Sequence, residues 1–290
     1  MRSALVALLV CATLSACATG AGHPTPTAQP IPSCFPVERL SAEDRRWADR
    51  LLLRAVDGEA LYTVAGGLKP VSSDGGTLRL RVYPSVDRAA LDSLERLQRI
   101  AAALTCGDVA ASVQLFAATF AERGGDSTRI ADLVFVHRAR TAALVARHQP
   151  FFATLGVTPA MRAEDVVHAV EHAARAPRWR GYGLLFGYPD AAVDFFVRAG
   201  IEGDSTKRLV PREFRRIDTW RRYPAASGAE PTLAAFVYAV PAGAAPDSGD
   251  RALAAAAEPV YADYRTRRAA LGADTSGIVA LLRAWGRVGR

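Results

Sequence analysis

The sequence predicts an α+β fold, namely a helix-rich single domain with a small antiparallel sheet. Segments whose apolar residues repeat at helical spacing outnumber segments in which apolar and polar residues alternate. The predicted strands follow one another rather than alternating with helices, which favours antiparallel pairing. With 290 residues, half of them hydrophobic, the chain can bury a substantial core. The sequence contains no internal repeat, so we expect one globular domain over residues 38–290.

The first half of this domain mixes both kinds of segment. Ser41 is a suitable helix N-cap, acids follow it in the first turn, and Gly66, Gly67 and Pro70 end that helix. The alternating segment TLRLRVY predicts a half-buried strand. The predicted elements are helices over 41–66, 87–104 and 139–149, a strand over 77–83, and a hairpin of strands over 109–120 and 129–137.

The second half predicts more helices and two further strands. Pro189 suits the first position of a helix that Gly200 stops. Phe236, Tyr238 and Val240 alternate with smaller residues, as expected of a strand. The predicted helices cover 162–174, 190–199, 250–271 and 276–286, the strands cover 210–218 and 232–240, and a Pro/Gly/Ala loop covers 241–249.

The N-terminus has the features of an export signal. Arg2 is followed by an apolar stretch over 4–13, which is too short to span a bilayer of roughly 30 Å. The next residues are Leu14, Ser15, Ala16 and Cys17, an order that resembles the lipobox of bacterial lipoproteins. The resemblance implies that residues 1–16 are a signal peptide, and that Cys17 becomes the N-terminus and carries the diacylglycerol and an amide-linked acyl chain such as palmitate. The alternative is an ordinary secretory signal with an A-x-A cleavage site at 16–18.

Residues 17–37 are expected to form the lipidated N-terminus and a flexible tether. Within it, residues 18–33 are rich in Pro, Thr and Ala and span at most about 50 Å between lipid and folded domain. Because Ala18 rather than an acid follows the cysteine, the resemblance favours the outer membrane, with the domain facing the periplasm. The first predicted partner is therefore the membrane, through the N-terminal lipid.

The remaining cysteines suggest one disulfide. Cleavage of the signal peptide removes Cys11, and lipidation uses Cys17. The two remaining cysteines, Cys34 and Cys106, are expected to lie in an oxidising compartment. We expect these two to form a disulfide that joins the end of the tether to the end of the helix near Leu104. The alternative is a pair of buried free thiols.

The net charge of +7 gives little functional information. Lys69 and Lys207 are the two lysines, so arginine supplies almost all of the positive charge. A sequence rich in Arg, Ala and Gly is also what a GC-rich genome produces. Because the arginines are spread along the chain, we predict no nucleic-acid partner.

One short motif suggests metal chemistry. His168, Glu171 and His172 fit H-x-x-E-H, which is similar to the zinc motif of inverzincin peptidases. The resemblance implies two imidazole ligands and a glutamate that activates the zinc-bound water. The third ligand of that family has no recognisable counterpart downstream. The alternative is a solvated helix face that holds Glu171 with both histidines, opposite an apolar face containing Val167 and Val170.

The segment 180–190 combines three glycines with three aromatic residues immediately before a predicted helix. Tyr182, Gly183, Gly187 and Tyr188 could form the wall of a ligand pocket, because glycines let a ligand approach the backbone and tyrosines offer rings and hydroxyls. The alternative is a tight crossing of two elements, in which small residues allow close packing and aromatic residues fill the core.

The run from Arg212 to Arg222 places Phe214, Ile217 and Trp220 among charged residues, mostly arginine. Such a stripe could contact anionic lipid or saccharide. The alternative is the solvated face of a strand or short helix.

These patterns lead to one preferred function and two alternatives. We expect a membrane-anchored envelope lipoprotein with a non-enzymatic domain that binds a small ligand or an envelope protein, and no cofactor. One alternative is an anchored zinc-dependent hydrolase that uses His168, Glu171 and His172. The other is an envelope-assembly factor that contacts anionic lipid. The sequence has no P-loop, G-x-S-x-G, C-x-x-C or EF-hand motif.

Overall fold

The computed structural model describes residues 34–73, 77–82, 84–116, 127–221, 236–272 and 276–289. The predicted signal peptide, Cys17 and most of the tether lie outside these ranges, as do Tyr83 and Arg222. Residues 32–290 form one compact unit. Phe35 and Val37 are buried in its core, so the fold begins a few residues before the predicted boundary at residue 38.

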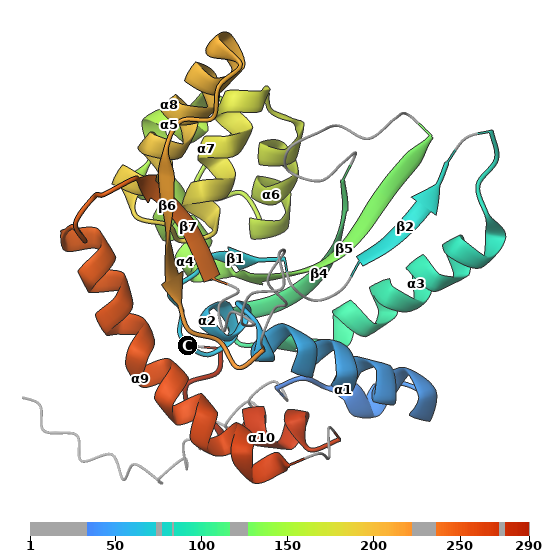
Figure 1. Cartoon of the computed structure of the whole chain (residues 1–290). Coiled ribbons are helices and arrows are strands. Elements are labelled where there is room, and N and C mark those ends of the chain that lie inside the picture. The colour runs from blue at the N-terminus through green and yellow to red at the C-terminus, as the bar shows by residue number, and fades with distance from the viewer. Residues whose placement is uncertain are drawn as a thin grey trace, which may run out of the picture. The chain divides into compact units, whose positions relative to one another are not determined.

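The described residues of this unit form helices and strands (Figure 1). The helices are the short 3-10 turn η1 (Val37–Arg39), α1 (Ala42–Asp57), α2 (Leu61–Val64), α3 (Arg88–Ala103), α4 (Arg138–Arg147), α5 (Gln149–Ala153), α6 (Ala163–His172), α7 (Arg175–Leu185), α8 (Asp190–Thr206), α9 (Ser248–Leu271) and α10 (Ile278–Ala284). The strands are β1 (Val71–Ser72), β2 (Thr77–Arg81), β3 (Thr105–Cys106), β4 (Val109–Phe116), β5 (Thr128–His137), β6 (Arg212–Ile217) and β7 (Phe236–Pro241).

The described strands form two antiparallel sheets. In the larger one, β4 and β5 pair along eight residues, from Val109 opposite His137 to Phe116 opposite Ile130. The short strands β1 and β2 both pair with the other edge of β5, and β3 pairs with β4. The smaller sheet is the β6–β7 pair. The predicted fold class, helix-rich α+β with a small antiparallel sheet, is therefore confirmed.

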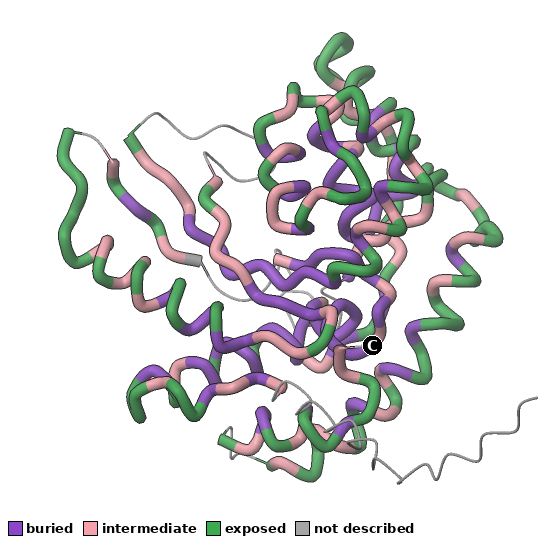
Figure 2. Tube along the Cα trace, turned by 180° about the vertical axis from the view of Figure 1, so that it is seen from behind, coloured by how far each residue is buried: buried purple, intermediate pink, exposed green. Residues whose placement is uncertain are grey.

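Helices cover both faces of the larger sheet (Figure 1). Side chains alternate along β5, so Leu133 and Phe135 belong to a core shared with α1, α2, α3, α9 and α10. Val134 and Val136 face the other way, into a core shared with α4, α6, α7 and α8. Figure 2 shows the buried residues concentrated along the central strands and on the helix surfaces that face them.

Some predicted boundaries were wrong. The first helix does not continue to Gly66, because α1 ends at Asp57, Gly58 caps it, and the short α2 follows. Gly200 does not stop α8, which continues to Thr206. Gly200 instead lies under the ring of Trp179, where a Cβ would overlap the indole. Pro189 is the N-cap of α8 rather than its first helical residue.

Helix α7 was not predicted. Its two internal glycines lower helix propensity by up to about 1 kcal/mol each, so the sequence pattern gave no sign of a helix. In the structure, a Cβ on Gly181 would lie 2.7 Å from Val170 Cγ1 of α6, and one on Gly183 would lie 2.9 Å from Val193 Cγ2 of α8. The glycines therefore allow α7 to pack closely between two neighbouring helices.

A Gly181→Ala variant is expected to be less stable by about 1–3 kcal/mol, as measured by urea unfolding. Overlap with Val170 outweighs the gain of up to about 1 kcal/mol that alanine brings to a helix. The Val170→Ala change should relieve the overlap, so the double variant should lose less stability than the two single losses added together. Additive losses, or a more stable Gly181→Ala protein, would contradict this account of the α6–α7 contact.

The β6–β7 hairpin lies between two groups of helices. Phe236 and Tyr238 of β7 join the core that contains α9 and α10. Ala239 faces the other way and packs against Phe195 and Ala199 of α8. Among the described helices, none combines the length and hydrophobicity needed to cross a bilayer.

Candidate functional site

An apolar cavity of about 220 Å3 lies between α7, α8 and the β6–β7 hairpin. Its lining residues come from four elements and are mostly aromatic. They are Trp179, Tyr182, Gly183, Phe186, Tyr188, Ala192, Val193, Phe196, Phe214, Val237, Tyr238 and Ala239. The cavity is thus formed by segments distant in sequence, and its walls present rings and aliphatic groups.

Two of the lining tyrosines have hydroxyl groups that are already hydrogen-bonded to buried carboxylates. The Tyr182 hydroxyl donates to Glu171 Oε2 at 2.9 Å, and Glu171 also lies 3.8 Å from Arg178 Nη1. The Tyr238 hydroxyl donates to Asp250 Oδ1 at 2.7 Å. These bonds fix the two rings, and the bonded hydroxyls contribute little polarity to the cavity.

Tyr188 connects the cavity to a buried ion pair. A left-handed turn at Gly187 ends α7, and the Tyr188 N–H donates to the Gly183 carbonyl at 3.1 Å. The ring then lies over Lys69, whose ammonium is 5.8 Å from its centroid and 4.3 Å from that of Phe236. Lys69 is fully buried, and its Nζ lies 2.5 Å from Glu59 Oε2.

Burial raises the pKa of five tyrosines, three of which line the cavity. Desolvation is the largest cause in each case, and a nearby carboxylate adds to it for Tyr182, Tyr188 and Tyr238. The other two are Tyr62 and Tyr264 in the core. The cavity therefore keeps neutral phenol rings throughout the physiological pH range.

This pattern predicts the alkaline behaviour of the protein. The unfolded chain loses tyrosine protons near pH 10, before the folded chain does, so stability is full below about pH 10 and falls above it. Five of the eight tyrosines should ionise together with unfolding, as followed by phenolate absorbance and circular dichroism. Reversible ionisation of all eight near pH 10, with native circular dichroism, would contradict the burial of these rings.

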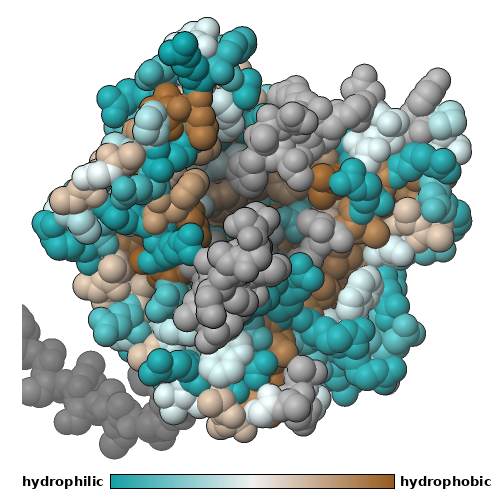
Figure 3. Space-filling view, in the orientation of Figure 1, coloured by the Kyte–Doolittle hydropathy of each residue, from teal (hydrophilic) through white to brown (hydrophobic). Residues whose placement is uncertain are grey.

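The rim of the cavity exposes aromatic surface. Phe196 is 39% exposed and Phe214 is 55% exposed, although both line the cavity. Figure 3 shows apolar surface near α8 at the upper left of the molecule, surrounded by hydrophilic residues. Exposed aromatic side chains at the entrance of an apolar cavity are typical of a binding site.

A second, larger hollow of about 560 Å3 lies on the other side of Tyr188. One wall is α4, with Arg140, Arg147 and His148, and another is the start of α8. Asp190 lies 3.6 Å from His148 Nε2 and 3.9 Å from Arg147 Nη2. The charges facing this hollow are therefore partly balanced within it, and its lining mixes polar and apolar groups.

The structure brings together three of the four residues predicted for a ligand pocket. Tyr182, Gly183 and Tyr188 line the apolar cavity, while Gly187 and Tyr188 line the larger hollow. The close-packing interpretation describes Gly181 and Gly183, which let α7 approach α6 and α8. Ligand binding by this segment stays a prediction. The sequence reasoning missed Trp179, Phe186 and Phe196, for which the aromatic content around the glycines was the available signal.

The H-x-x-E-H motif does not assemble into a ligand set in the structure. His168 and His172 are exposed on α6, with ring centroids 4.1 Å apart. Glu171 was expected on the same solvated face, but it is buried, because the unpredicted α7 covers it with Tyr182 and Arg178. Among the described residues, no three His, Cys, Asp or Glu side chains converge as metal ligands. The zinc alternative stays an untested prediction.

The Arg212–Arg222 run does not form one amphipathic face. In β6, Arg212, Phe214 and Arg216 project from one side, and Phe214 is exposed. Ile217 is buried in the core, and Trp220 is half-buried beneath Arg268, whose guanidinium carbon lies 5.3 Å from the ring. The apolar residues of the run therefore belong to different environments.

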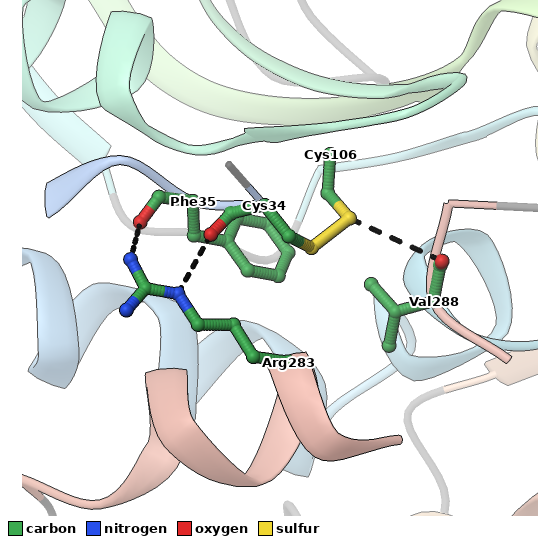
Figure 4. Close-up of a disulfide and its surroundings, with 5 residues drawn as sticks. All are labelled: Cys34, Phe35, Cys106, Arg283 and Val288. Atoms are coloured by element: carbon green, nitrogen blue, oxygen red, sulfur yellow. Dashed lines mark hydrogen bonds between the residues drawn. A yellow bond between two sulfur atoms is a disulfide. The ribbon is translucent and has the colours of Figure 1, made fainter. Parts of the chain in front are cut away.

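The predicted cysteine pair lies beside Arg283 of α10 (Figure 4). Cys34 and Cys106 are joined by a disulfide, with Cα atoms 4.3 Å apart. Arg283 of α10 donates to the carbonyls of Cys34 and Phe35 at 2.8 and 2.7 Å, as Figure 4 shows. The start of the described chain is therefore fixed to both α10 and β3.

Comparison with known proteins gives no match to this chain among family models, curated proteins or solved structures.

Proposed function

We propose that this chain is a membrane-tethered binding protein whose ligand places a compact apolar group in the cavity between α7, α8 and the β6–β7 hairpin. The observation that carries the proposal is the aromatic lining of that cavity. Seven of its lining residues are aromatic: Trp179, Tyr182, Phe186, Tyr188, Phe196, Phe214 and Tyr238. Packed helices and the β6–β7 hairpin form the walls of the cavity, so its shape exists before a ligand arrives.

The size of the cavity limits the ligand. An apolar protein cavity of about 150 Å3 can take up benzene, so about 220 Å3 suits one substituted ring or a short alkyl chain. Burial of apolar surface contributes roughly 25 cal/mol per Å2, which supplies the main driving force for such a ligand. Because the hydroxyls of Tyr182 and Tyr238 are already bonded, polar ligands gain little inside the cavity.

The rim offers a test that leaves the core intact. Octanol is expected to bind the wild-type protein in calorimetric titrations, and a Phe196→Ala/Phe214→Ala variant should bind it about ten-fold more weakly. Leu115→Ala is the matched control, because Leu115 is a similarly exposed apolar residue on β4 that does not line the cavity. Equal binding by all three proteins would refute the proposed site.

We also propose that the N-terminus anchors this domain to the bacterial outer membrane, facing the periplasm. The support is the lipobox-like order of Leu14, Ser15, Ala16 and Cys17, which follows an apolar stretch of signal-peptide length. More than one acyl chain is needed for stable anchoring. The tether would leave the binding domain free to meet a ligand away from the bilayer.

Anchoring can be tested by growing cells with labelled palmitate. Label should appear in the wild-type protein and in a Cys11→Ser control, whose change lies within the signal, and should be lost in Cys17→Ser. An unlabelled wild-type protein, or an intact mass showing that the mature chain starts elsewhere than residue 17, would refute the anchor. The binding test above does not depend on this outcome.

A further inference from the structure

The rim of the apolar cavity carries positive charge that described acidic residues do not neutralise, and we infer that the ligand is a small amphipathic anion. The inference rests on the proposed function, because it names the ligand chemistry of the same cavity. The apolar body of the ligand fills the cavity, and its negative group lies beside Arg216 of β6. An alkyl carboxylate of medium chain length, such as octanoate, is the simplest molecule of this kind.

Strand geometry places Arg216 at the rim. Side chains alternate along a strand, so Phe214 and Arg216 project from the same face of β6. In the register of the hairpin, Phe214 lies opposite Ala239 and Arg216 lies opposite Val237. The cavity is lined by Phe214, Ala239 and Val237. Arg216 therefore neighbours Phe214 on its own strand and Val237 on β7, and both of these residues line the cavity.

The other arginines around the cavity are mostly paired with acids. Carboxylate partners are present for all three arginines of α7, namely Arg175, Arg178 and Arg180. Arg215, on the face of β6 opposite to Phe214 and Arg216, also has one. The distances are 2.9 Å from Arg175 to Asp204, 3.8 Å from Arg178 to Glu171, 2.6 Å from Arg180 to Asp194, and 3.8 Å from Arg215 to Asp250.

Arg216 differs from these four arginines. It is exposed, and no described carboxylate lies within 4.0 Å of its guanidinium nitrogens. Arg212, two residues before Phe214 on the same face, also has no described carboxylate partner and donates instead to the Val210 carbonyl. The face of β6 that borders the cavity is thus apolar at its centre and cationic on both sides.

An apolar site with a cationic border selects ligands by charge. A carboxylate at the rim gains an ion pair with Arg216, whereas an ammonium at the same place is repelled. Exposed ion pairs have modest strength, so the expected preference for an anion over a neutral molecule of the same chain length is about five-fold. Salt should reduce this preference, because it screens exposed charges.

The test compares three ligands that share one apolar body. Octanoate, octanol and octylamine are titrated into the purified chain by calorimetry, at low and at high salt. Octanoate should bind about five-fold more tightly than octanol at low salt, and octylamine most weakly. In Arg216→Ala the first two should bind equally, Arg216→Lys should keep the preference, and Arg216→Glu should favour octylamine.

A matched control removes an arginine that does not face the cavity. Arg198 is exposed on α8, and helical spacing turns it away from Ala192, Val193 and Phe196, which line the cavity. Arg198→Ala should therefore keep the full preference for octanoate. Loss of that preference in this variant would mean that net charge, rather than Arg216, sets the selectivity.

The outcomes separate this inference from the proposed function. Equal affinities of the wild-type protein for all three ligands would overturn the anion inference and leave an apolar binding site. Failure of all three to bind would overturn both proposals. A third outcome combines two results: octanoate fails to bind, and Arg216→Ala weakens flotation of the protein with vesicles of anionic phosphatidylglycerol. In that case Arg216 binds a membrane surface, and the inference is wrong.

Discussion

A Glu59→Gln variant is expected to be less stable than the wild-type protein by about 3–5 kcal/mol, as measured by urea unfolding. Glu59 lies in the turn after α1, and its carboxylate is 2.5 Å from the ammonium of fully buried Lys69. Removing that negative charge takes the carboxylate away from a buried cation that also lies near the rings of Phe186, Tyr188 and Phe236. Cation–π contacts compensate for only part of the lost ion pair.

The control for this prediction removes both charges. A Glu59→Gln/Lys69→Met variant should regain most of the lost stability, because replacement of a buried pair by apolar groups is often neutral. A single Glu59→Gln change that costs less than about 1 kcal/mol would show that the pair is not desolvated as described. Because Tyr188 lies over Lys69, the single variant should also bind octanol more weakly than the double variant.

Loss of the disulfide is expected to have the second large effect. The bond between Cys34 and Cys106 closes a loop with a sequence separation of 72, for which loop-closure entropy predicts about 4 kcal/mol of stabilisation. Strain and residual structure usually reduce this value, so we expect Cys34→Ser/Cys106→Ser to be less stable by about 2–4 kcal/mol. The loss should be visible as a lower urea midpoint, with a larger m-value because the unfolded chain without the cross-link exposes more surface.

Mass spectrometry provides the covalent check for that prediction. The unreduced mature protein should show no alkylation at Cys34 or Cys106, and reduction should expose both thiols. The α10 contact offers a partial control, because Arg283→Ala removes the hydrogen bonds to the carbonyls of Cys34 and Phe35 without breaking the bond. Two freely alkylated thiols in the oxidised protein would refute the cross-link.

Hydrophobic periodicity predicted most elements of the fold. The alternation over 77–83 indicated β2, and the two apolar runs over 109–120 and 129–137 indicated β4 and β5. The capping pattern at Ser41 correctly indicated the start of α1, where Ser41 Oγ accepts from the Asp44 N–H at 3.1 Å. These features are local, so they can be read from neighbouring residues alone.

Helix α7 could not be predicted in this way. Its glycines oppose a helix locally, and their benefit arises only from contact with Val170 and Val193 on other helices. The burial of Glu171 follows from the same helix and was therefore missed with it. Properties that depend on a neighbouring element need knowledge of packing, which periodicity does not contain.

The candidate site was predictable only in part. Tyr182, Gly183 and Tyr188 stood out because glycine and aromatic residues are concentrated there, and they do line the cavity. Phe214, Val237 and Ala239 reach it through the pairing of β6 with β7, and that register depends on tertiary structure. The free charge of Arg216 likewise becomes visible only when the partners of the surrounding arginines are known.

The most direct test of the binding site is to locate a neutral apolar ligand on the protein. Nuclear Overhauser contacts between octanol and the aromatic protons of the folded chain would provide this location. We predict contacts to the rings of Trp179 and Phe214, which face the cavity from α7 and β6. Contacts to other surfaces, such as the region of Leu115, or none at all, would contradict a binding function for this cavity.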